Sequence, residues 1–302
     1  QGSRNQGTGV GGDAEGDTFS GIDGFIGSDF NDRLRLPEDR GNLFLDGGDG
    51  FDTLELRQFQ DFRNDDLLNF EDILINDSTG GRKGFDIHSS QLEDIERIRI
   101  NGDVEVDIAI VLDGEDVDLS QIEFIGFDDD DIIRVIGESD RDVMIGSTGK
   151  DSLDGGSGND LLEGREGDDR LEGDNGKDTL NGGEGDDTLV GGDNDDLLIG
   201  GAGADLMDGG GGEDVADYST SDAAVTVDLV ADTGSGGHAE GDTVRAIDGV
   251  IGSAFGDTLD GDGRANQFFG EDGNDTVNGG SGDDTIRGGE GNDSLSGGND
   301  QD

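Results

Sequence analysis

The chain has 302 residues, and its 76 acidic and 19 basic side chains give a formal net charge of −57. Self-repulsion on this scale opposes a compact state unless cations neutralise it, and it makes nucleic acid and anionic membranes poor partners. No cysteine is present, which excludes a disulfide framework, and no apolar run is long enough to span a membrane. With only 29% hydrophobic residues the composition alone would favour disorder, but glycine and aspartate recur periodically, which favours an ordered repeat.

The first residues carry little folding signal. Gln1-Gly2-Ser3 resembles the remnant of a cleavable tag, so we expect residues 1–8 to be a tag remnant and linker. Because the chain ends at Asp302 in the middle of a repeat, we expect it to be a piece of a larger protein. Residues 7–12 match the G-x-G-x-x-G pattern of dinucleotide-binding turns, but no strand precedes them, so a flexible linker is the better interpretation.

Residues 9–136 form the next predicted region. Stretches such as FEDILIND and VEVDIAIVLD have period-two apolar spacing, which predicts strands. Turn signals interrupt these stretches roughly every 20–28 residues, which suggests the wide rungs of a solenoid. We expect a degenerate lead-in followed by a parallel β-helix-like segment that stacks on the next region and caps it, since an open coil end would expose its core.

A nine-residue repeat dominates the rest of the chain. Eight units follow one another without a gap from Gly146 to Asp217, and a degenerate unit from Gly137 precedes them. A second array of such units begins at Gly252 and runs to the end of the chain. We therefore predict a first array over residues 137–217, a lateral connector with strand-like AVTVDL over residues 218–251, and a second array over residues 252–302.

Each unit divides into a turn and a strand. Glycine at the first, second and fourth places permits the positive φ of a tight turn. The sixth place is almost always aspartate, and the eighth is apolar, so the last three residues suit a short strand with one inward side chain. Two units then make one coil of a flattened solenoid, so turns on the same edge recur with a two-unit period. In the first array the apolar eighth-place residues are Met144, Leu153, Leu162, Leu171, Leu180, Leu189, Leu198 and Met207.

The G-G-x-G-x-D-x-U-x pattern of units such as GGEGDDTLV resembles the haemolysin-type, repeats-in-toxin (RTX) family of calcium-binding repeats. The resemblance implies an all-β fold, a right-handed parallel β-roll or β-helix solenoid with Ca²⁺ in the turns. It also implies that each ion lies between turns of the same edge, roughly ten ions in all. The stretch over residues 12–34, which matches residues 237–259, looks like the lead-in that precedes many such arrays.

Elementary chemistry agrees with calcium as the cofactor and partner. One inward apolar residue in nine cannot offset the entropy of ordering a unit whose aspartates repel one another. Carboxylates and the carbonyls of glycine-rich turns are hard oxygen ligands, which suit the six to eight ligands and tolerant geometry of Ca²⁺ better than the strict octahedron of Mg²⁺. Zinc would need His or Cys, and His88 and His238 are the only histidines.

The candidate calcium ligands are the sixth-place aspartates. On one edge of the first array they are Asp151, Asp169, Asp187 and Asp205, and on the other Asp142, Asp160, Asp178, Asp196 and Asp214. In the second array they are Asp257, Asp275 and Asp293 on one edge and Asp284 on the other. The matching lead-in adds Asp32, which corresponds to Asp257, and Asp52, which corresponds to Asp275.

Several units depart from the pattern, and there we expect weaker or missing sites. Asp140, Asn194 and Arg264 replace the fourth-place glycine, Asn266 replaces the ligand aspartate, and Ala216 replaces the apolar residue. The acidic run over residues 128–131 is open between a solvated loop and the start of calcium ligation, with Asp131 in the sixth place.

No catalytic motif is found: there is no HExxH, no GxSxG and no EF-hand spacing, so we predict a non-enzymatic module. Two roles stay open. The first is a structural or adhesive module, exported unfolded by type I secretion as the resemblance implies, folded by extracellular calcium, and facing a polysaccharide or a cell surface. The second is an accessory module of an extracellular enzyme, for example one that modifies polysaccharides. The oligomeric state is left open.

Overall fold

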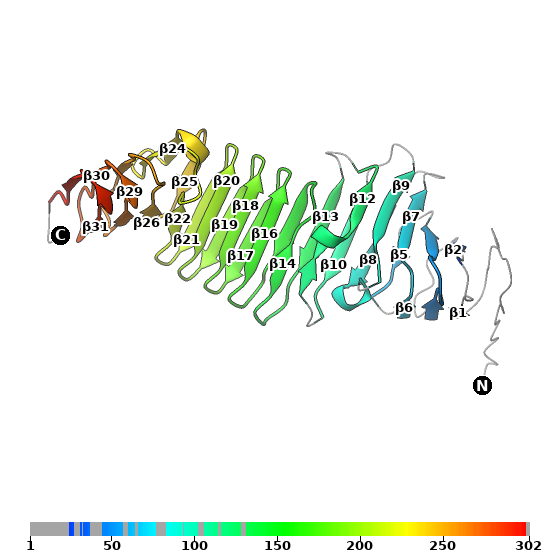
Figure 1. The fold of residues 1–302 in the computed structure, drawn as a ribbon. Coiled ribbons are helices and arrows are strands. Elements are labelled where there is room, and N and C mark those ends of the chain that lie inside the picture. Colours follow the sequence, from blue (N-terminus) through cyan, green and yellow to red (C-terminus); the bar gives the residue numbers. More distant parts are fainter. Residues whose placement is uncertain are drawn as a thin grey trace. The chain divides into compact units, whose positions relative to one another are not determined.

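The computed structural model describes residues 24–26, 31, 33–36, 44–56, 60–63, 66–76, 83–92, 94–101, 106–113, 116–127 and 131–299 (Figure 1). In these ranges the regular structure is strand, with three short 3-10 turns and no α-helix. The chain divides into two compact units, which we call unit 1 (Gln1–Ile136) and unit 2 (Gly137–Asp302). The predicted all-β parallel solenoid is confirmed, since nearly all strand pairs in both units are parallel.

The described residues of unit 1 form three groups of parallel strands. One sheet runs in the order β1 (Gly24–Ile26), β3 (Phe44–Asp46) and β6 (Asp66–Leu68). A second runs in the order β2 (Arg33–Leu36), β4 (Thr53–Leu56), β7 (Asp72–Asn76), β9 (Arg97–Asn101) and β12 (Glu123–Ile125). A third group runs in the order β5 (Gln60–Asp61), β8 (Lys83–His88), β10 (Val106–Val111) and β13 (Ile132–Ile136). The remaining elements are β11 (Val117–Asp118) and the 3-10 turns Ser89–Gln91 and Leu119–Gln121.

The core of unit 1 is a set of stacked apolar columns. Leu54 pairs with Ile73, and Ile73 with Ile98, and all three side chains are buried. The spacing of these partners changes from one rung to the next, and it exceeds the 18 residues that separate partners in the two-unit coil of the first array. Phe62 and Phe85 add an aromatic contact with ring centroids 6.3 Å apart. Several inward residues in each rung give this unit a larger core per coil than one inward residue in nine would allow.

Unit 2 is built from two long sheets, one for each side of the flattened coil (Figure 1). The first contains, in spatial order, β15 (Asp151–Asp154), β17 (Arg170–Asn175), β19 (Thr188–Asp193), β21 (Leu206–Gly211), β25 (Thr243–Arg245), β24 (Thr233–Ser235), β23 (Thr226–Asp228), β27 (Thr258–Asp260), β30 (Thr276–Asn278) and β33 (Ser294–Ser296). The second contains β14 (Val143–Ile145), β16 (Leu161–Glu166), β18 (Thr179–Glu184), β20 (Leu197–Ala202), β22 (Val215–Asp217), β26 (Gly249–Ile251), β28 (Gln267–Phe269) and β31 (Thr285–Arg287). Two short strands, β29 (Asp272–Gly273) and β32 (Glu290–Gly291), pair by themselves, and Gly237–Ala239 is a 3-10 turn.

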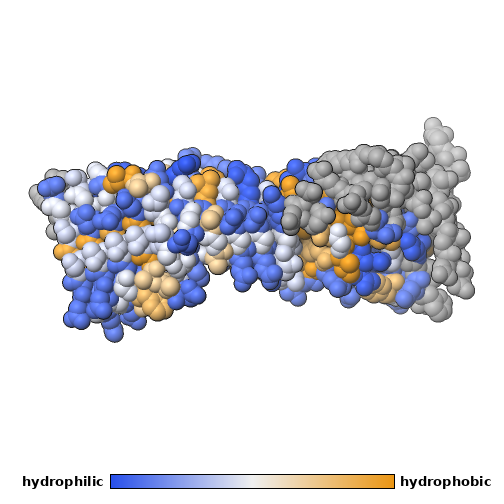
Figure 2. Space-filling view, turned by 90° about the horizontal axis from the view of Figure 1, so that it is seen from above, coloured by the Kyte–Doolittle hydropathy of each residue, from blue (hydrophilic) through white to orange (hydrophobic). Residues whose placement is uncertain are grey.

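The register of the first array follows the repeat. Leu153 pairs with Leu171, and Leu171 with Leu189, so neighbouring strands of one sheet come from alternate units. The eighth-place side chains are buried, each exposing at most 1% of its surface, and they form the core between the two sheets. Ala216, at the last eighth place, is buried as well. Figure 2 shows that the coloured surface is mainly hydrophilic, with apolar residues in small groups.

The segment over residues 218–251 differs from the expected lateral connector. Its strand β26 pairs in parallel with β22 of the first array and with β28 of the second, and β25 pairs with β21. These strands therefore fill positions in the two sheets, and the lateral placement is wrong. Only β24 departs from the pattern, because it pairs antiparallel with β23 and β25 as an inserted hairpin. Asp242 and Asp248, directly before β25 and β26, begin the D-x-U-x pattern again, which a search with the nine-residue period misses.

In the part of the chain that the structure describes, we find no helix with the length and apolarity needed to cross a bilayer.

Candidate metal centre

The sixth-place aspartates link the turns of each edge into a ladder. The backbone N–H of Asp151 donates to Oδ1 of Asp169 at 2.8 Å, and the N–H of Asp169 donates to Oδ1 of Asp187 at 2.8 Å. On the other edge, the N–H of Asp160 donates to Oδ1 of Asp178 at 2.8 Å, and the contact repeats at each later turn of the array. From Asp160 to Asp214, one carboxylate oxygen of each sixth-place aspartate is thus used to hold the preceding turn of the same edge.

The second carboxylate oxygen is buried without a hydrogen-bond donor. This holds for Oδ2 of Asp160, Asp169, Asp178, Asp187, Asp196, Asp205, Asp214 and Asp275. Buried polar atoms in proteins nearly always have a partner, and leaving an ionised one without a partner is costly. A regular row of such oxygens is therefore a structural feature that a cation would satisfy.

Burial of these carboxylates shifts their protonation. Loss of solvent, together with the negative charges of Asp151 and Asp187, raises the pKa of Asp169 to about 8. For the same first cause, burial, the pKa is raised to about 7 for Asp196 and Asp205. Burial in these turns therefore disfavours the ionised carboxylate, and a bound cation would remove that penalty.

The first-place glycine of each unit faces the orphaned oxygen. A Cβ placed on Gly164 would lie 2.3 Å from Oδ2 of Asp169 and 2.7 Å from the carbonyl oxygen of Gly182, in the next turn of the edge. The same arrangement recurs at Gly173 and Gly191. Each turn thus brings a carboxylate oxygen and a backbone carbonyl together where no side chain fits. Hard oxygen ligands of this kind match Ca²⁺, so the residues present fit the ion that the sequence predicts.

The second place of each turn needs a left-handed backbone. Gly183, Gly192 and Gly201 have φ values of 115°, 116° and 101° there. Arg165 and Asp174 occupy the same place with φ of 86° and 66°, a conformation that favours glycine. These two turns carry a local conformational cost that their glycine-containing neighbours avoid.

In the units that begin at Gly146 and Gly252 a serine closes the turn, which the sequence analysis missed. The N–H and the hydroxyl of Ser147 both donate to Oδ2 of Asp151, at 2.7 and 2.9 Å. The N–H and the hydroxyl of Ser253 likewise donate to the two carboxylate oxygens of Asp257. The signal was available, because serine takes the second place in GSTGKDSLD and GSAFGDTLD, where most other units have glycine.

Two further sixth-place residues were also missed. The N–H of Asp205 donates to Oδ1 of Asp242 at 2.9 Å, and the N–H of Asp214 donates to Oδ2 of Asp248 at 3.4 Å. They extend the two ladders by one turn each. They lie 37 and 34 residues after their partners, so a search with the two-unit period does not reach them.

The remaining predicted residues have varied surroundings. Asp284 is buried, and its Oδ1 accepts the N–H of Asn266, while Asp293 is less buried and accepts the N–H of Asp275 at 3.2 Å. Asp142 is buried, and its N–H donates to Asp160. Asp32 lies outside the described residues.

Two predicted residues of unit 1 occupy ladder-like positions. Asp52 is buried, and its N–H donates to the carboxylate of Glu71 at 2.6 Å, so a glutamate takes the partner's place. Asp131 is buried and accepts the N–H of Val106 at 2.7 Å, while residues 128–130 lie outside the described part. Within the described residues no group of three or more His, Cys, Asp or Glu side chains converges as a metal cluster. A turn offers its carboxylate together with backbone oxygens.

Comparison with protein families gives a direct match to the repeats. The family model described as "RTX calcium-binding nonapeptide repeat (4 copies)" matches residues 125–162, 136–171, 154–189, 181–216, 251–286 and 269–302. The matches cover both arrays and leave residues 217–250 between them. A search of curated proteins gives no match to the chain.

Proposed function

Because the chain belongs, through residues 125–216 and 251–302, to the RTX calcium-binding nonapeptide repeat family, we propose that it is an exported structural module whose turns bind calcium through the sixth-place aspartates. The family is a calcium-binding structural module, so calcium binding itself is the chain's family property. The observation that carries the residue assignment is the row of buried Oδ2 atoms without donors, from Asp160 to Asp214 and at Asp275.

Calcium, when bound, would supply positive charge and several coordination positions to oxygens that lack donors. The chain's own residues then have distinct tasks. The aspartate Oδ1 holds the preceding turn through its N–H, Oδ2 would ligate the ion, and the first-place glycine carbonyl of the next turn on the same edge would add a further oxygen. The eighth-place apolar residues exclude water from the space between the sheets. With one ion between each pair of successive turns on an edge, the two arrays would hold roughly ten ions.

The calcium affinity expected of such sites supports export of the module from the cell. Calcium modules that work outside cells typically have Kd values of about 10⁻⁴–10⁻³ M, so such sites would be empty in a bacterial cytosol and filled outside. The net charge of −57 would keep the cation-free chain expanded during secretion. We therefore place the folded module in the extracellular space or on a bacterial cell surface, where it would act as a rigid, adhesive spacer facing other cells or polysaccharide.

A pair of charge-neutralising variants in one unit tests the assignment. Asp169→Asn removes a buried sixth-place carboxylate, and Glu166→Gln removes an exposed carboxylate from the same turn. Calcium titrations followed by circular dichroism and isothermal titration calorimetry should show at least about tenfold weaker calcium binding at the affected site, or its loss, in Asp169→Asn alone. Equal behaviour of the two variants would show that general charge, and not the sixth-place ligand, controls calcium binding.

A further inference from the structure

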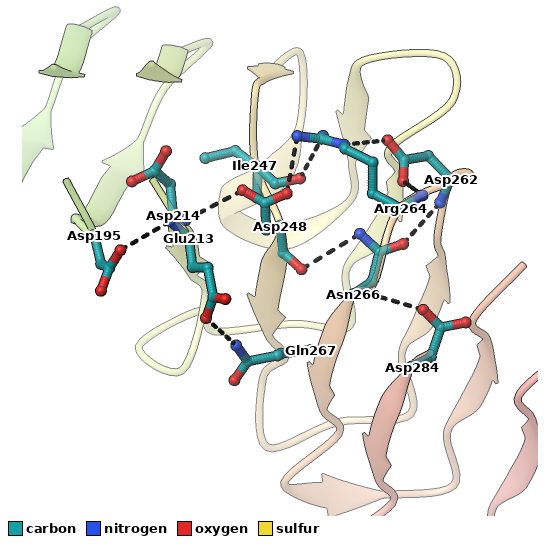
Figure 3. A network of polar contacts seen from close by, with 10 residues as sticks. All are labelled: Asp195, Glu213, Asp214, Ile247, Asp248, Asp262, Arg264, Asn266, Gln267 and Asp284. Atoms are coloured by element: carbon teal, nitrogen blue, oxygen red, sulfur yellow. Dashed lines mark hydrogen bonds and ion pairs between the residues drawn. The ribbon is translucent and has the colours of Figure 1, made fainter. Parts of the chain in front are cut away.

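One turn of unit 2 has neither the fourth-place glycine nor the sixth-place aspartate that most turns of the repeat have. In the unit from Gly261 to Phe269, Arg264 stands at the fourth place, where most units have glycine, and Asn266 stands at the sixth place, where they have aspartate (Figure 3). A repeat unit without its ligand could simply be degenerate. The contacts of these two residues indicate a specific alternative.

The guanidinium group of Arg264 lies among oxygens. Its Nη1 forms an ion pair with Oδ1 of Asp248 at 2.8 Å, its Nε donates to Oδ2 of Asp262 at 2.9 Å, and its Nη2 donates to the carbonyl oxygen of Ile247 at 3.1 Å (Figure 3). Two carboxylates and one carbonyl from successive turns of the same edge thus surround a positive charge that belongs to the protein. Oxygens of this kind are the ones a calcium ion would take.

Asn266 turns a hydrogen-bond donor toward the neighbouring turn. Its Oδ1 accepts the N–H of Asp262 at 3.0 Å, and its Nδ2 donates to the carbonyl oxygen of Asp248 at 3.4 Å (Figure 3). The orientation of the amide is set by its partners, because a backbone N–H needs an acceptor and a carbonyl needs a donor. The amide NH₂ of Asn266 cannot ligate a cation, and its Oδ1 already accepts a hydrogen bond. This turn therefore offers calcium fewer free oxygens than a turn with a sixth-place aspartate.

The other edge at the same level is also completed by protein groups. The hydroxyl of Tyr218, which is buried, donates to Oδ2 of Asp242 at 2.9 Å, while Oδ1 of Asp242 accepts the N–H of Asp205. Asp257, one turn further, accepts the N–H of Val225 at 2.8 Å and the donors of Ser253. Both oxygens of each of these carboxylates therefore have donors. By contrast, Oδ2 has no donor in Asp205, which precedes them along the chain, or in Asp275, which follows them.

The apolar packing changes together with the polar contacts. The segment over residues 218–251 buries eight apolar side chains, about twice as many as a stretch of the first array of similar length, where each nine-residue unit buries one. These eight are Tyr218, Val225, Val227, Leu229, Ala239, Val244, Ile247 and Val250. The antiparallel pairing of β23 with β24 is local in sequence, so it needs little loop closure.

We propose that residues 218–269, which we call the junction, keep their fold without calcium, with Arg264 in the place of the ion beside Asp248 and the Tyr218 hydroxyl in the place of the ion beside Asp242. This rests on the proposed function of the two arrays. The junction is then a preformed end for both arrays, on which calcium-bound turns stack when the ion is supplied. It is a calcium-independent folding template inside a calcium-dependent solenoid.

Hydrogen exchange on the full 302-residue chain, measured by mass spectrometry in EGTA and in calcium, tests the proposal. In EGTA, peptides from residues 225–250 should exchange at least about tenfold more slowly than peptides from residues 161–198, and calcium should slow the latter. Exchange in EGTA that is equally fast in both regions overturns the junction and leaves the calcium-binding arrays intact. Failure of calcium to protect residues 161–198 would instead contradict the proposed function.

Two further variants address the residues directly. Arg264→Gln removes the internal cation and should abolish most of the junction's protection in EGTA, while Arg245→Gln, the same change at an exposed residue of β25, should leave it unchanged. The double variant Arg264→Gly with Asn266→Asp restores the repeat pattern, and native mass spectrometry should detect one additional calcium ion. Unchanged protection in Arg264→Gln, or an unchanged calcium count in the double variant, would refute the assignment of Arg264.

Discussion

Unit 1 and the first array are both parallel β-solenoids with buried carboxylates, but they neutralise those carboxylates differently. In unit 1, Asp72 is fully buried, and Arg99 and Arg97 from the neighbouring strand β9 form ion pairs with it. Burial acts to raise the pKa of Asp72, yet the hydrogen bond and charge of Arg99 hold that pKa below its ordinary value. In the first array, Asp169 has no such partner, and burial raises its pKa to about 8.

The difference shows that the buried carboxylate of a solenoid rung can be neutralised in two ways. The rungs of unit 1 hold several core side chains and also an arginine paired with a buried acid, as in the ion pair between Arg33 and Glu55. The nine-residue units of the first array each bury one core residue, and no arginine forms an ion pair with their buried aspartates from Asp151 to Asp214, so the positive charge has to come from solution. The free energy of unfolding then depends on the calcium concentration in the first array and does not depend on it in unit 1.

Removal of calcium should have the largest effect and should separate the two regions. In EGTA the first array should lose most of its strand structure, because the orphaned carboxylates repel one another without a cation. Strands β7, β9 and β10 of unit 1 should stay protected, because their charges are paired and their cores are larger. Hydrogen exchange resolved by peptide measures both. Simultaneous loss of protection in both regions would show that unit 1 also depends on calcium, which contradicts the proposed difference.

The next effect concerns the arginine-paired acid of unit 1. Asp72→Ala removes a buried carboxylate that accepts from Thr53 and from two arginines, and it should destabilise unit 1 by about 2 kcal/mol. The loss should be the same with and without calcium, since no ion is involved. Urea denaturation in calcium and in EGTA measures it, and Glu123→Ala, at an exposed residue of β12 in the same sheet, serves as the control. A loss seen only in calcium would place an ion at Asp72.

The sequence was sufficient for the features that repeat with a fixed period. Asp169 and Leu171 could be assigned to a turn and to the core, because one nine-residue unit shows the pattern and its neighbours confirm it. The partners of Asp72 could not be assigned, since Arg97 and Arg99 lie 25 and 27 residues away with no constant period to relate them. Long-range pairs in irregular coils depend on the lengths of individual loops, which composition and periodicity do not specify.

The junction shows the same limit within unit 2. Asp242 and Asp248 carry the D-x-U-x pattern, yet the inserted hairpin shifts them out of the two-unit period. Arg264 and Asn266 could be identified from sequence as departures from the repeat. That Arg264 contacts two aspartates could not be inferred, because a guanidinium at a fourth place can as easily face solvent.

The pH should affect the two regions in opposite directions. In the cation-free first array the folded-state pKa values are raised to about 7 for Asp196 and Asp205 and to about 8 for Asp169. A raised folded pKa contributes stability that is full below the unfolded value of 3.8 and is lost as the pH rises through the folded value. In EGTA the array should therefore be more folded at pH 5 than at pH 8, and in calcium the apparent affinity should fall as the pH decreases, because protons compete for the same oxygens.

For Asp72 the sign is reversed. Its folded pKa lies below 3.8, so its contribution to stability is present above that value and is lost only as the pH falls below it. Circular dichroism from pH 8 to pH 3 in EGTA, combined with peptide-resolved exchange, measures both trends. A first array that gains strand as the pH rises in EGTA would show that the carboxylates are not buried as the structure has them.

The smallest expected effect concerns the left-handed residues at the second place of the repeat turn. Arg165→Gly and Asp174→Gly each replace a left-handed residue at the second place by glycine, which adopts that conformation freely, and each should stabilise the calcium-bound array by about 1 kcal/mol. The two variants change the net charge in opposite directions, so they separate backbone strain from electrostatics. Thermal denaturation in calcium measures the change, with Arg170→Gly, at a strand residue of β17 where glycine should destabilise, as the control. Stabilisation by Asp174→Gly together with destabilisation by Arg165→Gly would mean that charge, and not φ, limits these turns.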